Sequence, residues 1–551
     1  MLVASRSAVL ATSEFVSAIL RAMNDLASNA SRNVRFAEWR WLALWFMLLL
    51  PLAILFPPIP IDETRYLTAA WEMFNSGQWL VPTVNGAWYS DKSPLLFWVI
   101  ASGWKVFGVH TWVARVEALI IALLTLLMTR RLAARLGFEA READAAMWLL
   151  AGCAGFALFA TAIMFDLLLA LTVLGVLHAL LDLDARRYAR GIALLGLWIG
   201  LGLLAKGPVV LLHVAGVALL APLWSEGARA AKARWYFSLL AGVLIGIAII
   251  ACWLMPAAFY AGPGYWQPLI GKITGRLHES FAHGRPFWWY LPLIPVLLLP
   301  WVLAVRAPSR AWCGLTRARA GIFLLCWWLP PLIAFCAISG KQIHYLAPLL
   351  PAWTLSGAYV LQNPNARLRG LYALFALATA IGLCLLPGWA ARTYGYPLQR
   401  SLLLFALVAL VIAAGVWRAW GRDVRSLALA ATSLASVSLL AGALALQPAL
   451  DVRPEAAFIA SALRAHVPIA HIEWHNGLFG YTGRLHQPLP VITRAQVLEW
   501  CRAHPNGWLI ASDRSDEPEG VAPARAWPYF LSGSKRIGAW QASDVLAARR
   551  R

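Results

Sequence analysis

Long apolar runs separated by short polar loops make up most of the chain. Runs of the length that an α-helix needs to cross a bilayer, about 20 residues, recur about 13 times. They cover approximately residues 41–57, 111–130, 144–163, 166–183, 190–206, 208–224, 235–256, 286–305, 319–338, 344–361, 370–389, 400–417 and 426–446. The pattern predicts a polytopic α-helical membrane protein with about 13 transmembrane helices.

Composition supports this class and excludes another. Of the 551 residues, 60% are hydrophobic and only 13% are charged, against roughly 25% charged in ordinary soluble domains. The net charge of +21 would suit a nucleic-acid binder. However, Lys and Arg are concentrated between apolar runs and do not alternate with exposed aromatic residues. We therefore expect the chain to bind a membrane and no nucleic acid.

The basic residues also predict the orientation of the chain. Loops after the even-numbered runs are rich in arginine, for example at Arg130, Arg187, Arg229 and Arg418. The positive-inside rule places these loops and the N-terminus in the cytoplasm. An odd number of spans then places the C-terminus outside.

Three parts follow from this topology. Residues 1–40 form a cytoplasmic N-terminal segment, residues 41–447 a transmembrane domain with a large outer loop at 57–110, and residues 448–551 an outer domain. In the outer loop, residues 64–74 and 95–107 show apolar positions at helical spacing and many aromatic side chains. Such segments are typical of helices that lie in the membrane interface.

The tail after residue 447 has a different composition. Residues 455–466 and 493–504 have helical patterns, and residues 469–474 and 508–511 have strand patterns. Thr493 is suited to cap the second helix. This alternation predicts a small α/β domain.

Charged residues stand out in the first outer loop, where Asp62, Glu63 and Arg65 are followed by Lys92. Charges beside hydrocarbon commonly mark a functional site. Asp62 could be an acidic helix start that pairs with Arg65, a general base, or a metal ligand. Arg65 and Lys92 together suit a phosphate, although both could also extend to the interface as cationic anchors.

Other predicted outer segments add polar groups at the same face. Asp166 and Lys206 occupy tight turns, and a further group is Lys341, His344 and Tyr345. Asp166 could be a cap and Lys206 an anchor at the membrane edge. Polar residues of several outer segments at one face are nevertheless expected of a site at the mouth of the helix bundle.

Evidence for a cofactor in the sequence is limited to a candidate divalent metal. Asp91 and His283, together with His278 and Glu279, are the candidate ligands, but their spacing does not match a local metal motif. The seven cysteines are scattered and form neither a disulfide framework nor a zinc motif. No other cofactor is required by the sequence.

Several of these segments carry a resemblance to a known family. The segments are residues 62–66, 77–82, 91–95, 206–208, 286–290 and 341–348. In this order they resemble the bacterial ArnT-type aminoarabinose transferases, which are integral-membrane glycosyltransferases of the GT-C fold related to protein O-mannosyltransferases. The resemblance extends from about residue 40 to residue 360.

The resemblance implies a reaction and roles for three residues, with Asp62 near the reaction centre and Lys92 and Arg65 at the carrier phosphate; the other expected site residues follow from the polar outer segments. It implies transfer of 4-amino-4-deoxy-L-arabinose from undecaprenyl phosphate to a lipid A phosphate, at the periplasmic face of the bacterial inner membrane, as in polymyxin resistance. The expected catalytic residues are Asp62, Asp166 and Glu63. The expected substrate-binding residues are Arg65, Tyr66, Tyr89, Lys92, Lys206, Lys341, His344 and Tyr345.

Two alternatives remain open at this point. Another glycosyltransferase that uses a polyprenyl-phosphate sugar, with a protein or a different lipid as acceptor, would share all of this chemistry. A lipid or sugar transporter would instead place polar residues deep within broken spans, often in two related halves.

Overall fold

The computed structural model describes residues 36–268, 271, 284–304, 318–358, 366–394, 402–418, 422–529 and 536–549. The chain forms two compact units, Met1–Leu48 and Leu49–Arg551. In the first unit only the start of α2 (Phe36–Leu55) is described. The account below concerns the second unit.

Every predicted apolar run is wholly or largely helical. Besides α2, the matching elements are α5 (Thr111–Arg135), α6 (Ala140–Ala151), α7 (Ala154–Ala160), α8 (Phe165–Asp184), α9 (Tyr188–Lys206), α10 (Val209–Leu219), α11 (Ala221–Trp224), α13 (Lys232–Ala261), η1 (Phe287–Tyr290), α15 (Leu293–Leu297), η2 (Trp301–Ala304), α17 (Arg319–Ala337), η3 (Ile343–Leu349), α18 (Leu350–Ala358), α19 (Ala366–Tyr394), α20 (Leu403–Arg418) and α21 (Val424–Leu450). A short helix, α12 (Glu226–Ala230), precedes α13.

Seven helices in the described residues are long and apolar enough to cross a membrane. The number becomes eight if α6 and α7, which are bent by 66° at their junction, form one broken span. The prediction of a polytopic helical membrane protein is therefore confirmed. The total of about 13 spans stays a prediction, because the remaining apolar helices are shorter than a full span.

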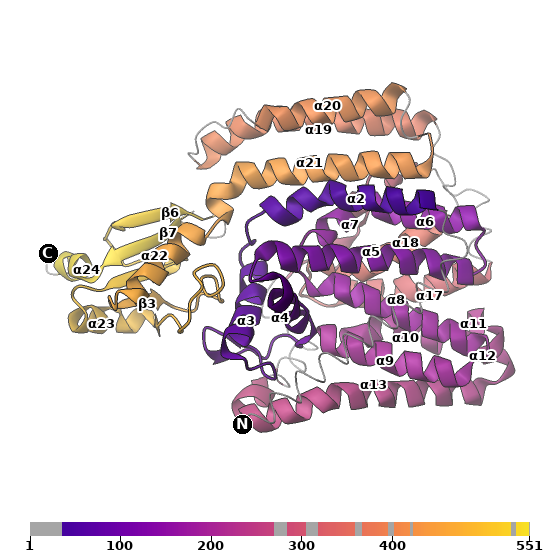
Figure 1. Ribbon diagram of the computed structural model, residues 1–551, viewed down its shortest axis with the longest axis horizontal. Coiled ribbons are helices and arrows are strands. Elements are labelled where there is room, and N and C mark those ends of the chain that lie inside the picture. The colour runs from indigo at the N-terminus through magenta and orange to yellow at the C-terminus, as the bar shows by residue number, and fades with distance from the viewer. Residues whose placement is uncertain are drawn as a thin grey trace. The chain divides into compact units, whose positions relative to one another are not determined.

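Helix α8 lies inside the bundle and α13 lies at its edge (Figure 1). In the most apolar stretch of α8, 94% of the residues are buried, against neighbours that include α5, α9 and α10. In the corresponding stretch of α13 only 22% are buried. Because α8 is surrounded by protein, it must be apolar on all sides. Its charged residues are accordingly restricted to its two ends.

Basic residues of several predicted cytoplasmic loops form ion pairs with the C-terminal end of α8. Asp182 forms ion pairs with Arg135 at 2.7 Å and with Arg190 at 3.3 Å. Asp184 pairs with Arg319, at the start of α17. The basic loops thus meet at one end of α8, and Asp166 lies at the other end.

The first outer loop contains two helices joined by a hairpin. Both predicted helices are present, as α3 (Asp62–Ser76) and α4 (Leu95–Phe107). Between them, β1 (Thr83–Val84) and β2 (Ala87–Trp88) pair antiparallel. Asn85 and Gly86 connect the strands with positive φ values of 53° and 75°, as an Asn-Gly hairpin turn requires.

The tail forms a five-stranded mixed sheet with the order β4-β3-β5-β7-β6. The strands are β3 (Ile469–Ile472), β4 (Val491–Ile492), β5 (Trp508–Ala511), β6 (Arg525–Pro528) and β7 (Arg536–Gln541). The helices are α22 (Arg453–Arg464), α23 (Val497–Ala503) and α24 (Ala542–Ala548), with short 3-10 turns at η5 (Arg494–Gln496) and η6 (Arg514–Asp516). The predicted α/β domain is therefore confirmed as a small domain with a mixed sheet.

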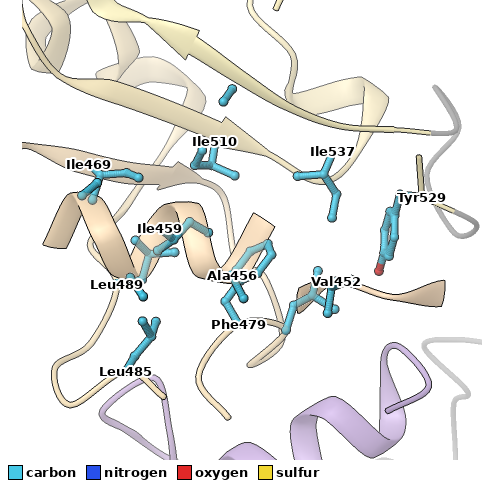
Figure 2. Close-up of a cluster of buried hydrophobic side chains, with 14 residues drawn as sticks. Val452, Ala456, Ile459, Ile469, Phe479, Leu485, Leu489, Ile510, Tyr529 and Ile537 are labelled. Atoms are coloured by element: carbon cyan, nitrogen blue, oxygen red, sulfur yellow. The ribbon is translucent and has the colours of Figure 1, made fainter. Parts of the chain in front are cut away.

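Helices cover both faces of this sheet. Ile469 and Ile510 pack with α22 in one apolar cluster, which Figure 2 shows from close by. Their strand neighbours Ala470 and Leu509 belong to a second cluster with residues of α23 and α24. Alternate strand residues point to opposite faces, so the domain has two thin cores, one on each side of the sheet.

Candidate functional site

The first turn of α3 holds Asp62 in a polar cluster. The Arg65 Nη2 donates to Asp62 Oδ1 at 2.5 Å, and the Tyr66 hydroxyl donates to the same oxygen at 3.4 Å. The Asp62 side chain is 45% exposed. The helix-start pairing expected as the alternative is therefore present. An ion pair this exposed stabilises little, and the second carboxylate oxygen has no hydrogen bond among those of the described residues.

Lys92 reaches the same cluster from the other side of the hairpin. Its Nζ lies 5.9 Å from the Tyr66 ring centre and 5.7 Å from the Phe165 ring centre. The two rings meet edge to face at 5.0 Å. Tyr89 packs beside them, against Phe97 of α4. These aromatic contacts, within the range of cation–π attraction, place the Lys92 ammonium next to α3 and the start of α8.

Asp166 is buried and joins three helical elements. Lys206, at the end of α9, pairs with Asp166 Oδ1, and the Nε2 of His344 in η3 lies 3.8 Å from Oδ2. The Lys206 Nζ also lies 4.9 Å from the ring centre of Tyr345. The structure thus brings together four of the expected site residues that are far apart in the sequence.

Tyr66 connects this group with Asp62. Burial raises the pKa of Tyr66 well above its usual range, and the negative charges of Asp62 and, more weakly, Asp166 act in the same direction. Arg65 opposes them. Tyr66 is therefore neutral. Its hydroxyl contacts Asp62 and its ring contacts Phe165, which precedes Asp166, so the two groups lie next to each other in one site. It contains the cations Arg65, Lys92 and Lys206.

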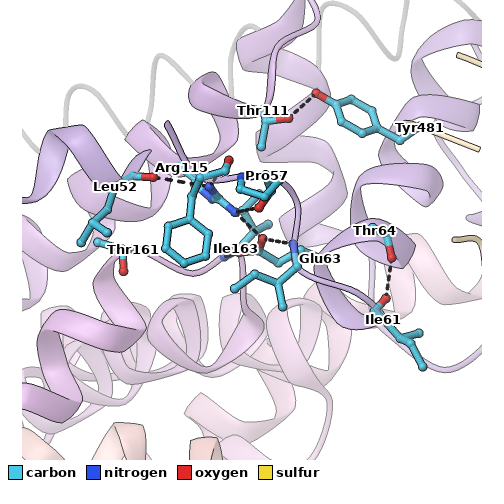
Figure 3. A network of polar contacts seen from close by, with 12 residues as sticks. Leu52, Pro57, Ile61, Glu63, Thr64, Thr111, Arg115, Thr161, Ile163 and Tyr481 are labelled. Carbon is cyan, nitrogen blue, oxygen red and sulfur yellow. Dashed lines mark hydrogen bonds and ion pairs between the residues drawn. The ribbon is translucent and has the colours of Figure 1, made fainter. Parts of the chain in front are cut away.

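Glu63 faces the opposite way from Asp62. Figure 3 shows its carboxylate in contact with Arg115 of α5, whose Nη2 donates to Glu63 Oε2 at 2.5 Å. The backbone amides of Ile59 and Ile163 donate to the two Glu63 oxygens, each at 2.8 Å. The Glu63 and Arg115 side chains are only 3% and 1% exposed. This geometry favours a structural role for Glu63 over the catalytic role expected from the sequence.

Arg115 was missed by the sequence analysis. It also donates to the carbonyls of Phe56 and Pro57, at 2.6 and 2.8 Å, and so fixes the connection between α2 and α3. A signal was present, because Arg115 is a lone arginine one turn into an apolar run. Such residues almost always pair within the protein.

The ammonium of Lys341 is held by two backbone carbonyls. Its Nζ donates to the carbonyl of Ile338 and, at 3.4 Å, to that of Arg285. The side chain is buried. Its ammonium therefore closes the turn after α17, and the substrate-binding role expected for it finds no support in this geometry.

The metal expectation stays a prediction. Within the described ranges, no three side chains of His, Cys, Asp or Glu come together to hold a metal ion. Asp91 is half-buried in the turn before α4. His283, His278 and Glu279 lie outside the described residues.

Known sequences resemble this chain over most of its length. Residues 91–255 match the family described as dolichyl-phosphate-mannose-protein mannosyltransferase. The chain is 29% identical to an undecaprenyl phosphate-alpha-4-amino-4-deoxy-L-arabinose arabinosyl transferase of Edwardsiella ictaluri, over 78% of this chain and 80% of that protein. The transferase of the same description from Pseudomonas aeruginosa is 33% identical, over 65% of this chain and 66% of that protein.

A solved structure has the same fold. The crystal structure of ArnT from Cupriavidus metallidurans bound to undecaprenyl phosphate superposes with a TM-score of 0.73. The superposition covers 92% of this chain and 98% of that one, at 19% sequence identity. The shared architecture includes both the helix bundle and the tail domain, because so little of either chain is left out.

Proposed function

The chain belongs to the ArnT-like family of undecaprenyl phosphate aminoarabinose arabinosyltransferases, and we propose that it transfers 4-amino-4-deoxy-L-arabinose from undecaprenyl phosphate to a phosphate of lipid A. The reaction takes place at the periplasmic face of the bacterial inner membrane, with the N-terminus in the cytoplasm. The observation that carries the proposal is the convergence of Arg65, Lys92 and Lys206 on one site with Asp62 and Asp166.

The three cations suit the leaving group of this reaction. An acceptor oxygen bonds to the anomeric carbon of the sugar while the bond from that carbon to the carrier phosphate breaks. The electron pair of that bond goes to the phosphate, which gains negative charge. Arg65, Lys92 and Lys206 stabilise this charge electrostatically. Asp166 holds the Lys206 ammonium in place and leaves its remaining donors for the phosphate.

Asp62 acts on the acceptor. A phosphate monoester has a second pKa near 6 and is mostly ionised at neutral pH, so it needs little help from a base. Asp62 orients the acceptor and takes a proton only from an acceptor that still carries one. The neighbouring Arg65 reduces the repulsion between its carboxylate and an anionic acceptor.

Lipid A mass spectrometry tests this function directly. The chain is expressed in a strain that lacks the modification but makes the donor. We expect lipid A with the added mass of one aminopentose on a phosphate. Unmodified lipid A, with the full-length protein present in the membrane, would overturn the proposal.

A second candidate acceptor is a protein, because residues 91–255 match a family described as a protein mannosyltransferase. The same cells decide between the two. Label from a radioactive sugar donor would appear in the protein fraction for this candidate and in the lipid fraction for the favoured one.

A further inference from the structure

A segment of the tail domain lies against the first outer loop. We call residues 477–489 the docking segment. Thr68 of α3 inserts its hydroxyl into this segment: Oγ1 donates to the Gly477 carbonyl at 2.7 Å and accepts from the Tyr481 amide at 2.9 Å. Thr68 is fully buried. The fit is close, because a Cβ on Gly480 would lie 2.5 Å from Thr68 Cγ2.

The hairpin between α3 and α4 meets the other end of the docking segment. Asn85 Nδ2 donates to the Leu489 carbonyl at 2.9 Å, and the Leu489 amide donates to Asn85 Oδ1 at 2.8 Å. This reciprocal pair resembles the pairing of two strands. Asn85 is also the left-handed turn residue of the hairpin, so the contact fixes the backbone at that point.

Further contacts extend to α4 and α5. The Tyr481 ring stacks on Trp104 of α4 at 5.2 Å with an interplanar angle of 6°. Its hydroxyl lies 2.9 Å from the Thr111 hydroxyl. Arg484 Nη2 donates to the carbonyl of Val109 at 2.7 Å. The docking segment therefore contacts every structured part of the first outer loop.

Glu72 connects α3 and the hairpin directly. Its carboxylate accepts from the Thr83 hydroxyl and the Asn85 amide, each at 2.6 Å, and from the Gly86 amide at 3.1 Å. The helix, the hairpin and the docking segment thus form a closed triangle. Hydrogen bonds join each of the three segments to the other two. A movement of one segment would therefore break hydrogen bonds to both others.

The triangle matters because the site cations lie on two of its sides. Arg65 lies in the first turn of α3, one turn before Thr68. Lys92 follows β2 by four residues and belongs to the hairpin side. Two cations bind one phosphate more tightly when the distance between the cations is already fixed in the free protein. If the cations become ordered only on binding, that ordering lowers the affinity.

We propose that Thr68 and Asn85 are positioning residues through which the tail domain sets the separation of Arg65 and Lys92. This inference rests on the proposed function, because it assumes that both cations bind the carrier phosphate. Neither residue touches the reacting groups. Their effect is therefore on the affinity for the donor, and the rate at saturating donor changes little.

Two substitutions remove these contacts with little other change. Thr68→Val keeps the shape of the side chain but leaves the Gly477 carbonyl and the Tyr481 amide without their partner. Asn85→Gly keeps the left-handed turn but removes the pair with Leu489. Thr68→Ser retains both hydrogen bonds and is the matched conservative variant. Arg494→Ala is the second control, because it breaks a polar contact within the tail domain, with Asp516.

Steady-state kinetics with purified full-length protein test the proposal. We expect the KM for the undecaprenyl-phosphate sugar to rise about tenfold in Thr68→Val and Asn85→Gly, as the loss of one or two buried hydrogen bonds suggests. The kcat should change by less than about twofold. Thr68→Ser and Arg494→Ala should resemble the wild type. A merely unstable variant would instead lose kcat at an unchanged KM.

Hydrogen–deuterium exchange gives a readout that does not depend on activity. Peptides covering residues 62–76 and 83–94 should exchange faster in Thr68→Val and Asn85→Gly than in the wild type, and the two controls should not differ from it. Wild-type KM and exchange in Asn85→Gly would overturn the proposal, even if Thr68→Val fails to fold. If the wild type transfers no aminopentose, the proposed function fails, whereas exchange still shows whether the docking segment holds the loop.

Discussion

The two sides of the first turn of α3 carry adjacent carboxylates with opposite surroundings. Successive helix residues point about 100° apart, so Asp62 faces the cation cluster while Glu63 faces α5. Asp62 is half exposed and Glu63 is buried against Arg115. Both oxygens of Glu63 accept hydrogen bonds from the protein, whereas one oxygen of Asp62 accepts none from the described part of the chain. The difference between the two neighbours therefore lies in exposure and hydrogen bonding, and it makes Asp62 the better candidate for contact with a substrate.

The largest effect is expected for Asp62→Asn, which tests whether Asp62 takes part in the transfer. We expect transfer to fall by at least about 10²-fold, because misplacing the acceptor by about 1 Å can cost that much, and asparagine cannot take a proton from an acceptor that still carries one. The amount of protein in the membrane should stay normal, since the Asp62–Arg65 pair is exposed. Transfer assayed in membranes and normalised to protein level checks this. Undiminished turnover would remove Asp62 from the reaction.

Glu63→Gln should show the opposite behaviour. Arg115 would be left as a buried charge without its counter-ion, which costs about 3–5 kcal/mol of stability. Thermal unfolding in detergent should therefore occur at a clearly lower temperature, and the protein that does fold should retain transfer. The double variant Glu63→Gln with Arg115→Met removes the unpaired charge and should recover part of the loss. Normal stability together with lost transfer would return Glu63 to the catalytic residues.

Lys92→Ala and Arg65→Ala test whether the two cations beside Asp62 stabilise the charge of the transition state. Each should lower the transfer rate by about 10²–10³-fold, the usual effect of removing one group that stabilises transition-state charge. Lys105→Ala is the matched control, because Lys105 lies on α4 and stacks on Trp79 at 4.3 Å, apart from the cluster. Kinetics with varied donor concentration measure the effect. Equal values for Lys92→Ala and Lys105→Ala would contradict the role of Lys92.

The smallest expected effect concerns pH and the tail domain. Burial lowers the pKa of His471 to about 4 and that of His475 well below its usual range. Both histidines are therefore neutral in the folded domain. In the unfolded chain they have the ordinary histidine pKa of about 6.5 and bind protons below that pH. The unfolding free energy of the domain should therefore decrease as the pH falls from about 6.5 towards 4, because the unfolded chain then binds protons that the folded domain does not. Exchange of peptides covering residues 469–481 at pH 7 and 5 measures this, and equal protection would refute it.

Most of the helices could be predicted from local patterns in the sequence. The apolar runs predicted the helices of the bundle, and aromatic spacing predicted α3 and α4 because each buries one face. In the tail, β4, β6 and β7 were not predicted. The middle of β7 (Arg536–Gln541) is buried on both faces and so lacks the alternation that marks a half-exposed strand.

The site was predicted as a set of residues, and of their partners only the pairing of Asp62 with Arg65 was expected. Asp62, Lys92 and Lys206 stand out as charges beside apolar sequence. The burial of Glu63 depends on Arg115, and the contact between Thr68 and Gly477 joins residues more than 400 positions apart. Such pairings follow from tertiary packing, which no local spacing encodes.

Helix α8 holds charged residues of both ends of the bundle at a fixed separation. From Asp166 to Asp184 it rises about 27 Å, close to the roughly 30 Å thickness of the hydrocarbon layer. Each end is fastened by ion pairs, to Lys206 at one and to Arg319 at the other. Sliding the helix along its axis would pull one of these charges away from its partner and into the apolar interior of the bundle. One helix therefore sets the distance between the Asp166–Lys206 pair and the ion pair at the opposite end of the bundle.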